Sequence, residues 1–136
     1  MIYLDSAAVV KLVRQEVCSA DLVSWLNKHD DVPLVSSALV EVEVPRALRR
    51  SAPQALIGVP AAVGRLFRLE IDSTIRATAA AFAEPTLRSL DAIHLATAQV
   101  LTNESGTALT AFVTYDRRLL DHAKEAGLPV ASPGQN

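Results

Sequence analysis

Two acidic side chains lie at the ends of short apolar stretches of the kind that form buried strands. Asp5 directly follows residues 2–4, and Asp116 comes two residues after the apolar stretch 109–114. In an open α/β sheet, the carboxyl ends of strands meet in the crevice where ligands bind, beside the point at which strand order reverses. If these two strands are neighbours, both acids face that crevice. An acid at such a position is also a common helix N-cap, so both roles remain open.

Two further acidic positions lie on predicted helices that could reach the same crevice. Asp91 lies in the first turn of a helix, where the helix dipole also favours an acid. Glu41 and Glu43 are about 200° apart around a helix, so only one of them can face the crevice. Arg46 and Arg50 share the helical stripe of Glu43. This pattern is typical either of intrahelical ion pairs or of a site acid followed by phosphate contacts.

Carboxylates gathered in one pocket repel one another, and without a cation at least one tends to stay protonated. A hard divalent cation removes this conflict, and an all-oxygen ligand set selects Mg²⁺ or Mn²⁺ over Zn²⁺. One or two such ions can activate water and stabilise charge on phosphate oxygens during hydrolysis. If the acids converge, the sequence therefore predicts metal-dependent hydrolysis of a phosphate ester.

The elements that must bring these acids together alternate between strand and helix. This alternation predicts an α/β domain with a mainly parallel five-stranded sheet flanked by helices on both faces. The predicted strands are 2–5, 32–36, 66–71, 109–114 and 128–130. The predicted helices are 6–14, one that begins near 19, 37–52, 72–82, one that begins near 87, and 117–126.

Two segments of this pattern are irregular. Pro45 lies inside the helix 37–52, and because proline lacks the amide N–H, we predict a bend or local break beside Glu41 and Glu43. Residues 53–64 contain glycines and prolines among apolar residues, which predicts a short helix and a loop.

Length and composition favour one domain over residues 1–136, with a loosely ordered tail from about residue 132. Half of the 136 residues are hydrophobic, and 21% are charged. No apolar run approaches the roughly 20 residues that span a bilayer, so we expect a cytoplasmic protein without membrane contact. The net charge of −2 offers no global attraction to nucleic acid, so such a partner would have to meet a local patch.

Other catalytic signatures are weak. Cys18 has no Cys or His nearby at metal-ligand spacing, and His94 follows Asp91 by one turn, where a packing role is the favoured interpretation. The sequence contains neither a Gly-x-Ser-x-Gly turn nor a phosphate-binding loop with Lys-Ser or Lys-Thr. Serine hydrolases and P-loop enzymes are therefore poor candidates.

Four stretches in this order and spacing resemble the PIN-domain ribonucleases, and among them the VapC-type toxins of bacterial toxin–antitoxin pairs. They are Ile-Tyr-Leu-Asp-Ser-Ala at 2–7, the segment from Ser-Ser-Ala-Leu to Arg-Ala-Leu at 36–48, Ser-Leu-Asp-Ala-Ile-His-Leu-Ala-Thr-Ala at 89–98, and Thr-Tyr-Asp-Arg-Arg-Leu at 114–119. The resemblance implies a PIN-like domain with an acidic pocket for Mg²⁺ or Mn²⁺ that cleaves RNA endonucleolytically. It also implies a homodimer and a cognate VapB-type antitoxin that covers the pocket.

The resemblance also assigns site residues by position. The residues that match the acidic quartet of the family are Asp5, Glu43, Asp91 and Asp116. The three aspartates are expected to ligate the metal, and the glutamate to bind a second ion or orient the attacking water. Ser6 and Thr114 match supporting hydroxyl positions, and Arg46 and Arg50 are candidate RNA phosphate contacts. The chain departs from the family at Pro45, and its next acid after the quartet is Asp121.

Three other classes of protein provide alternatives. A receiver-type signalling domain would use Asp72 as phosphoacceptor, but Ser6 and Ala7 stand where such domains carry an acidic pair, and Lys124 lies within a helix. A phosphatase of the haloacid dehalogenase type would need Asp-x-Asp, and position 7 is alanine. A metal-free binding module would use the acids only as helix caps.

Overall fold

Five short strands pair in the order β3-β2-β1-β4-β5, and every pairing is parallel. This computed structural model describes residues 1–135. The strands are Ile2–Leu4 (β1), Leu34–Ser37 (β2), Phe67–Leu69 (β3), Ala111–Val113 (β4) and Val130–Ala131 (β5). Strand order reverses between β1 and β4, which are neighbours. The acids that follow these two strands therefore lie at the same edge of the sheet, as the sequence predicts. The predicted α/β class and five-stranded sheet are confirmed.

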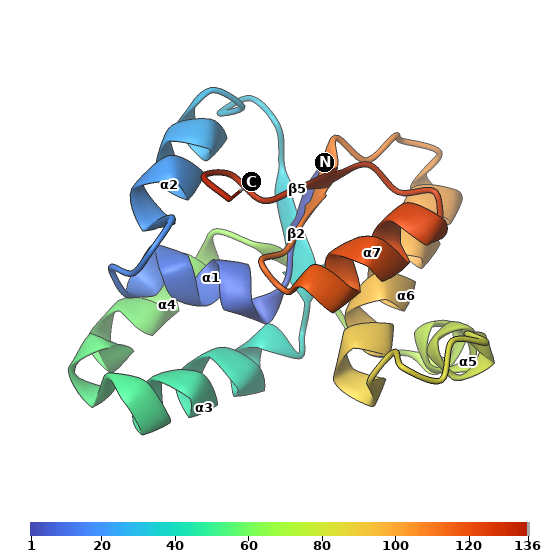
Figure 1. Cartoon of the computed structure of the whole chain (residues 1–136), viewed down its shortest axis with the longest axis horizontal. Helices are drawn as coiled ribbons and strands as arrows, with labels where there is room; N and C mark the ends of the chain where they lie inside the picture. The colour runs from blue at the N-terminus through green and yellow to red at the C-terminus, as the bar shows by residue number, and fades with distance from the viewer. Residues whose placement is uncertain (136) are drawn as a thin grey trace.

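Helices cover both faces of the sheet (Figure 1). They are α1 (Ser6–Val13), α2 (Ser19–Asn27), α3 (Val40–Ser51), α4 (Val59–Gly64), α5 (Ser73–Ala81), α6 (Ser89–Ser105) and α7 (Arg117–Glu125), with the 3₁₀ helix η1 at Pro53–Gly58. The first four helices pack on one face, α6 and α7 pack on the other, and α5 packs on α6. Within residues 1–135, no helix has the length and apolar character needed to cross a membrane.

The central strand divides the core between the two faces. Ile2 and Leu4 point toward the α1–α4 layer, whereas Tyr3 points toward α6 and α7. All three are fully buried, and each such side chain contributes roughly 1.5–3 kcal/mol. The ring of Tyr3 stacks on that of Phe112 in the neighbouring strand, with centroids 5.0 Å apart and an interplanar angle of 3°. The middle of the sheet is thus closely packed directly below the end of β1.

Helix α3 differs from the prediction in two ways. It begins at Val40 rather than at residue 37, because Ser37 ends β2 and the Ala38 N–H still donates to the Leu69 carbonyl of β3. Of the predicted bend or local break at Pro45, the break is wrong, since α3 runs through Pro45 to Ser51, and the bend stays a prediction. Three side chains of α3 are buried against the α1–α4 layer, and their packing outweighs the one missing backbone hydrogen bond. These residues are Val40, Val44 and Leu48.

Two smaller details concern α2 and the end of the chain. Val23 of α2 is 44% exposed, because Leu22 and Leu26 occupy the buried stripe of this helix. After β5, the Ser132 hydroxyl donates to the Thr114 carbonyl, and the Tyr115 hydroxyl donates to the Pro133 carbonyl. These bonds attach the first residues of the predicted loose tail to the end of β4.

Candidate active site

Asp5 leaves the carboxyl end of β1 and begins α1. One carboxylate oxygen accepts from the Ala8 N–H at 2.9 Å, and the other accepts from the Thr114 hydroxyl at 2.5 Å. The side chain is only 4% exposed. Burial raises the pKa of the Asp5 carboxyl, the charge of Asp91 raises it further, and the lowering effects of His94 and of these hydrogen bonds are smaller. Asp5 therefore caps a helix and also places a costly buried charge at the switch point of the sheet.

Asp116 occupies the equivalent place after β4. Its Oδ1 accepts from the backbone N–H groups of Arg118 and Leu119, so it caps α7. Its own N–H donates to the Thr114 hydroxyl oxygen at 3.1 Å, and that hydroxyl in turn donates to Asp5. Thr114 thus connects the two acids that end β1 and β4. The predicted convergence of Asp5 and Asp116 on one edge of the sheet is confirmed.

Asp91 approaches this edge from the first turn of α6, with Arg88 as its partner. The Arg88 Nε lies 3.4 Å from Asp91 Oδ2, and its Nη2 lies 3.2 Å from Asp116 Oδ2. Burial and then the charge of Asp116 raise the pKa of Asp91, which exceeds the lowering by Arg88. Arg88 therefore balances part of the negative charge. Sequence reasoning missed this residue, although its place three positions before an acid at a helix start was a usable signal.

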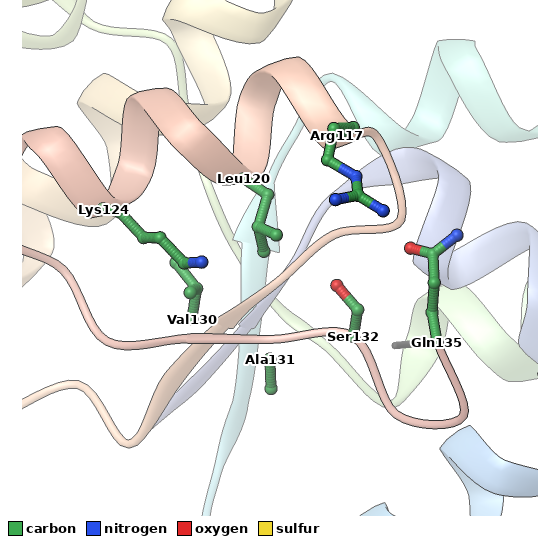
Figure 2. A pocket seen from close by; sticks show the side chains of 7 residues that line it. All are labelled: Arg117, Leu120, Lys124, Val130, Ala131, Ser132 and Gln135. Carbon is green, nitrogen blue, oxygen red and sulfur yellow. The ribbon is translucent and has the colours of Figure 1, made fainter.

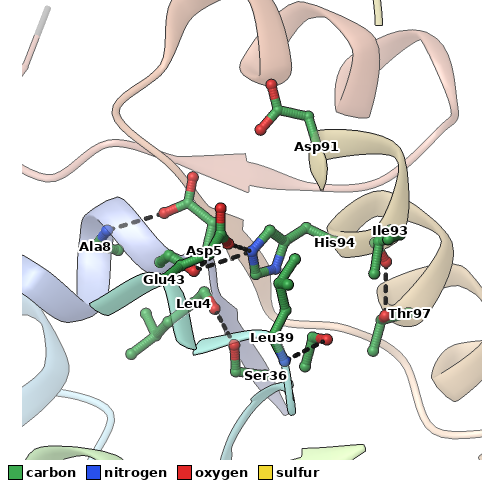
Figure 3. Close-up of polar contacts among 12 residues, drawn as sticks. Leu4, Asp5, Ala8, Ser36, Leu39, Glu43, Asp91, Ile93, His94 and Thr97 are labelled. Carbon is green, nitrogen blue, oxygen red and sulfur yellow. Dashed lines mark hydrogen bonds and ion pairs between the residues drawn. The ribbon is translucent and has the colours of Figure 1, made fainter. Parts of the chain in front are cut away.

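Glu43 reaches the site from α3, on the other face of the sheet (Figure 3). Its Oε1 accepts from the Ser6 hydroxyl at 2.6 Å and lies 2.8 Å from Nε2 of His94. Burial raises the pKa of Glu43, but the hydrogen bonds from His94 and Ser6 together outweigh it, so the net effect lowers that pKa. Glu41 instead lies 3.4 Å from Arg68 at the surface. The structure thus brings Glu43, and not Glu41, to the site.

His94 is both a packed residue and a neighbour of the acids. It is 2% exposed, Nδ1 lies 2.7 Å from the Tyr3 hydroxyl, and Nε2 lies near Glu43 and Ser6. The predicted packing role of His94 therefore describes only part of what this side chain does. Neither the contact of His94 with Glu43 nor the role of Tyr3 was predicted, because both depend on the position of α6 against β1.

The remaining sequence candidates lie at the surface. Arg46 and Arg50 are exposed on α3, and across the described part of the chain neither forms an ion pair with Glu43. Asp121 is exposed on α7. Asp72 caps α5 beyond the edge strand β3, away from the switch point, so the receiver-type alternative gains no support.

A cavity of about 300 Å³ opens beside these acids. The residues that line it are Glu43, Arg88, Ser89, Leu90 and Asp91. Figure 3 shows Asp5, Glu43 and His94 grouped at the end of β1, with Asp91 at the start of α6. A second cavity, of about 290 Å³, lies between α7 and β5 and is lined by Arg117 and Lys124 among others (Figure 2). Its described lining includes none of the four acids, whereas Glu43 and Asp91 line the first cavity.

The donor set suits a hard cation more than a soft one. The available donors are carboxylate and hydroxyl oxygens, whereas both ring nitrogens of His94 already have partners. The charge of Asp116 raises the pKa of Asp91, and the charge of Asp91 raises the pKa of Asp5, which is the electrostatic conflict that a divalent cation relieves. As the side chains stand, no three potential ligands among residues 1–135 converge into a ready-made metal cage. The residues fit Mg²⁺ or Mn²⁺ by chemistry, and binding would require the carboxylates to move.

The raised pKa of Asp5 predicts an unusual pH dependence of stability in a chelating buffer. A carboxyl whose folded pKa is raised stabilises the fold fully below its unfolded pKa, near 3.8, and loses that contribution as pH rises through the folded pKa. The free energy of unfolding, measured with urea at several pH values between 4 and 8, should fall more steeply with pH in wild type than in Asp5→Asn. The difference in slope should reach up to about 1.4 kcal/mol per pH unit. The introduced asparagine keeps an oxygen for the Ala8 cap, so parallel curves would contradict the assignment.

Comparisons with known proteins agree with this geometry. The PIN domain family matches residues 2–126, a range that includes all four acids. The chain is similar to ribonuclease VapC35 of Mycobacterium tuberculosis (strain ATCC 25618 / H37Rv), with 53% identity over 135 residues, covering 99% of this chain and 98% of the relative. Ribonuclease VapC46 of the same strain is 42% identical over 132 residues, which covers 97% of both chains.

Proposed function

This chain belongs to the PIN-domain family as a VapC-type ribonuclease, and we propose that it hydrolyses RNA phosphodiester bonds at the cavity beside β1, using Mg²⁺ or Mn²⁺. The residues that we assign to the reaction are Asp5, Glu43, Asp91 and Asp116. The observation that carries the proposal is that four acids from remote parts of the chain lie close together. Asp5 and Asp116 are joined through Thr114, and Glu43 and Asp91 line one cavity. Acids that only capped helices would not need to meet.

We assign the cation to Asp5, Asp91 and Asp116, whose oxygens suit a hard metal. When bound, the ion supplies charge neutralisation at the phosphate oxygens and activation of water. Thr114 fixes Asp5 relative to Asp116 through its hydroxyl. Arg88 is exposed and pairs with Asp91 and Asp116. Its guanidinium can leave one of these carboxylates and bind an RNA phosphate instead.

Glu43 has a different task in this proposal. Ser6 and His94 both engage Oε1, and within residues 1–135 no hydrogen bond is made to Oε2. Because Glu43 lines the cavity and its pKa is lowered, it remains an anion that can accept a hydrogen bond from the attacking water or bind a second ion. Glu43 and Asp91 both line the cavity, Glu43 from α3 and Asp91 from α6.

The experiment that tests the function is cleavage of single-stranded RNA with added Mg²⁺ or Mn²⁺, compared with the same reaction in EDTA. Single-stranded or looped RNA is the substrate to use, because proteins read RNA sequence most readily in that form. We expect internal cleavage with metal and none in EDTA. Cleavage that continues in EDTA would contradict the proposed mechanism, and no cleavage of any RNA with either metal would contradict the function.

Arg46 and Arg50 are our candidates for contacts with RNA phosphates outside the cavity. In an inactive Asp5→Asn background, Arg50→Ala should weaken RNA binding and lower the slope of log affinity against log salt by about 0.7. Arg49→Ala is the matched control, since Arg49 is exposed on the same helix but about 120° from Glu43 around the axis. An equal loss for both variants would show that charge alone, and not this face of α3, matters.

We further propose that the protein acts in the cytoplasm as a homodimer and is held inactive by a VapB-type antitoxin. The support is the likeness to the VapC ribonucleases over the whole chain. Leu90 lines the cavity and is exposed, so a partner that covered the cavity would also bury an apolar side chain. A small reading frame beside the gene that encodes a DNA-binding protein would support this assignment.

A further inference from the structure

A buried chain of hydrogen bonds runs from the centre of the sheet to the active-site glutamate. The Tyr3 hydroxyl lies 2.7 Å from Nδ1 of His94, and Nε2 of His94 lies 2.8 Å from Oε1 of Glu43. Tyr3 belongs to β1, His94 to α6 and Glu43 to α3, so the chain joins the sheet with helices from its two opposite faces. Figure 3 shows the His94 ring between its own helix and Glu43.

When His94 is neutral, the chemistry of these groups fixes the direction of each hydrogen bond. An ionised carboxylate only accepts, so Nε2 of His94 must donate to Glu43. A neutral imidazole that donates from Nε2 accepts at Nδ1, and the Tyr3 hydroxyl is the donor placed there. With both nitrogens engaged, His94 has no lone pair left for a metal ion. Its place in the site is to hold Glu43.

The first two members of the chain are held rigidly, whereas the last is not. Tyr3 is fully buried and stacks on Phe112 at 5.0 Å, and His94 meets the Tyr3 ring edge-on at 5.8 Å. Glu43 is only half-buried and extends from the first turns of α3. A half-buried glutamate has several rotamers to choose from, and fixing one of them costs side-chain entropy. The rigid pair therefore supplies the constraint that Glu43 lacks on its own helix.

We propose that Tyr3 and His94 are positioning residues that orient the Glu43 carboxylate, with Oε1 bound to His94 and Oε2 facing the cavity. This inference rests on the proposed function, because it assigns Tyr3 and His94 to that same site. Residues that orient a ligand or catalytic group from behind typically change metal affinity or activity by 10- to 100-fold when removed. His94→Leu should therefore lower kcat by about 10- to 100-fold and leave KM nearly unchanged, since His94 does not touch RNA.

Two further variants separate positioning from packing. His94→Gln offers an amide N–H for Glu43 and an amide oxygen for the Tyr3 hydroxyl, so it should restore most of the activity lost in His94→Leu. Tyr3→Phe removes one hydroxyl and retains the ring stacked on Phe112, and it should lower kcat by about tenfold or less. Thr102→Val is the matched control. Its hydroxyl bonds only to carbonyls within α6, so its kcat should equal that of wild type.

The experiment combines three measurements on each purified variant: kcat and KM for one RNA oligonucleotide, Mn²⁺ affinity by calorimetry, and the ¹⁵N spectrum of the His94 side chain. We expect wild type to carry hydrogen on Nε2 and not on Nδ1, and Tyr3→Phe to keep this tautomer, because Glu43 still accepts from Nε2. We expect weaker Mn²⁺ binding in His94→Leu than in His94→Gln. If His94→Leu fails to fold, Tyr3→Phe and His94→Gln are compared with wild type in its place.

The outcomes distinguish this inference from the function on which it rests. Wild-type cleavage together with full kcat in Tyr3→Phe and His94→Leu would overturn the positioning role and leave the nuclease assignment standing. A wild-type protein that cleaves no RNA would overturn the function, and the ¹⁵N spectrum would still test the hydrogen-bond chain. Hydrogen on Nδ1 in wild type would overturn the chain itself. A kcat of His94→Gln as low as that of His94→Leu would also count against it, because both hydrogen bonds are available to glutamine.

Discussion

Asp5→Asn is expected to lower the rate of RNA cleavage by about 10³-fold. Asparagine cannot supply the anionic oxygen that a hard cation requires at this position. A catalytic metal ion contributes several kcal/mol of charge stabilisation in the transition state. Because each 1.36 kcal/mol corresponds to a factor of ten in rate, a loss of about 4 kcal/mol corresponds to about 10³-fold. The measurement is the single-turnover cleavage rate at saturating Mn²⁺ or Mg²⁺.

This variant should remain folded, which makes its loss of activity interpretable. The amide oxygen of the introduced asparagine can still accept from the Ala8 N–H, and the substitution removes a buried charge. We expect a free energy of unfolding in EDTA at neutral pH that equals or exceeds the wild-type value by about 1 kcal/mol. Asp121→Asn, at an exposed acid on α7, is the matched control and should cleave as wild type does. Equal cleavage by wild type and a folded Asp5→Asn variant would remove Asp5 from the reaction.

Mn²⁺ is expected to raise the melting temperature of the wild-type protein substantially. A ligand at 100 times its Kd stabilises the folded state by about 2.7 kcal/mol, if it binds only that state. For a domain of this size, that corresponds to a rise of roughly 9 °C. The physical reason is the repulsion among Asp5, Asp91 and Asp116, which burial strengthens and a divalent cation cancels. Thermal unfolding followed by circular dichroism, with and without EDTA, measures the shift.

A pair of variants shows whether the rise in melting temperature comes from Mn²⁺ bound at the candidate site. Asp5→Asn should lose most of the rise, whereas Asp72→Asn, at an exposed helix cap beyond β3, should keep it. Sodium chloride at the same ionic strength should not reproduce the effect, because monovalent screening acts weakly on buried charges. A rise of equal size in wild type and Asp5→Asn would place the bound ion elsewhere on the molecule.

The architecture and the acids could be predicted from sequence because both follow local rules. Apolar stretches that end in Asp5 and Asp116, separated by helices, leave few arrangements other than a parallel sheet with both acids at one edge. The choice of Glu43 over Glu41 came from the likeness to a family, since helical geometry showed only that one of them could face inward. The start of α3 was misplaced because Ala38 pairs with β3, a partner remote in the chain.

The partners of the acids could not be predicted, because they come from side chains that only tertiary packing brings together. His94 lies among apolar residues of α6, and its pattern is that of a core residue. Its contacts join α6 to Tyr3 of β1 and to Glu43 of α3, elements that are remote in the chain. Arg88 follows the same rule, since its second partner, Asp116, is 28 residues away in sequence.

The shared hydroxyl of Thr114 joins the ends of β1 and β4. Asp5 and Asp116 follow adjacent paired strands. The Asp5 carboxylate accepts from the Thr114 hydroxyl and the Asp116 backbone N–H donates to it, so the backbone at Asp116 is tied to the Asp5 side chain. Glu43 and Asp91, by contrast, travel with helices that belong to separate cores on opposite sides. Because Glu43 and Asp91 line the cavity, its width is set by how far these two helical layers stand apart.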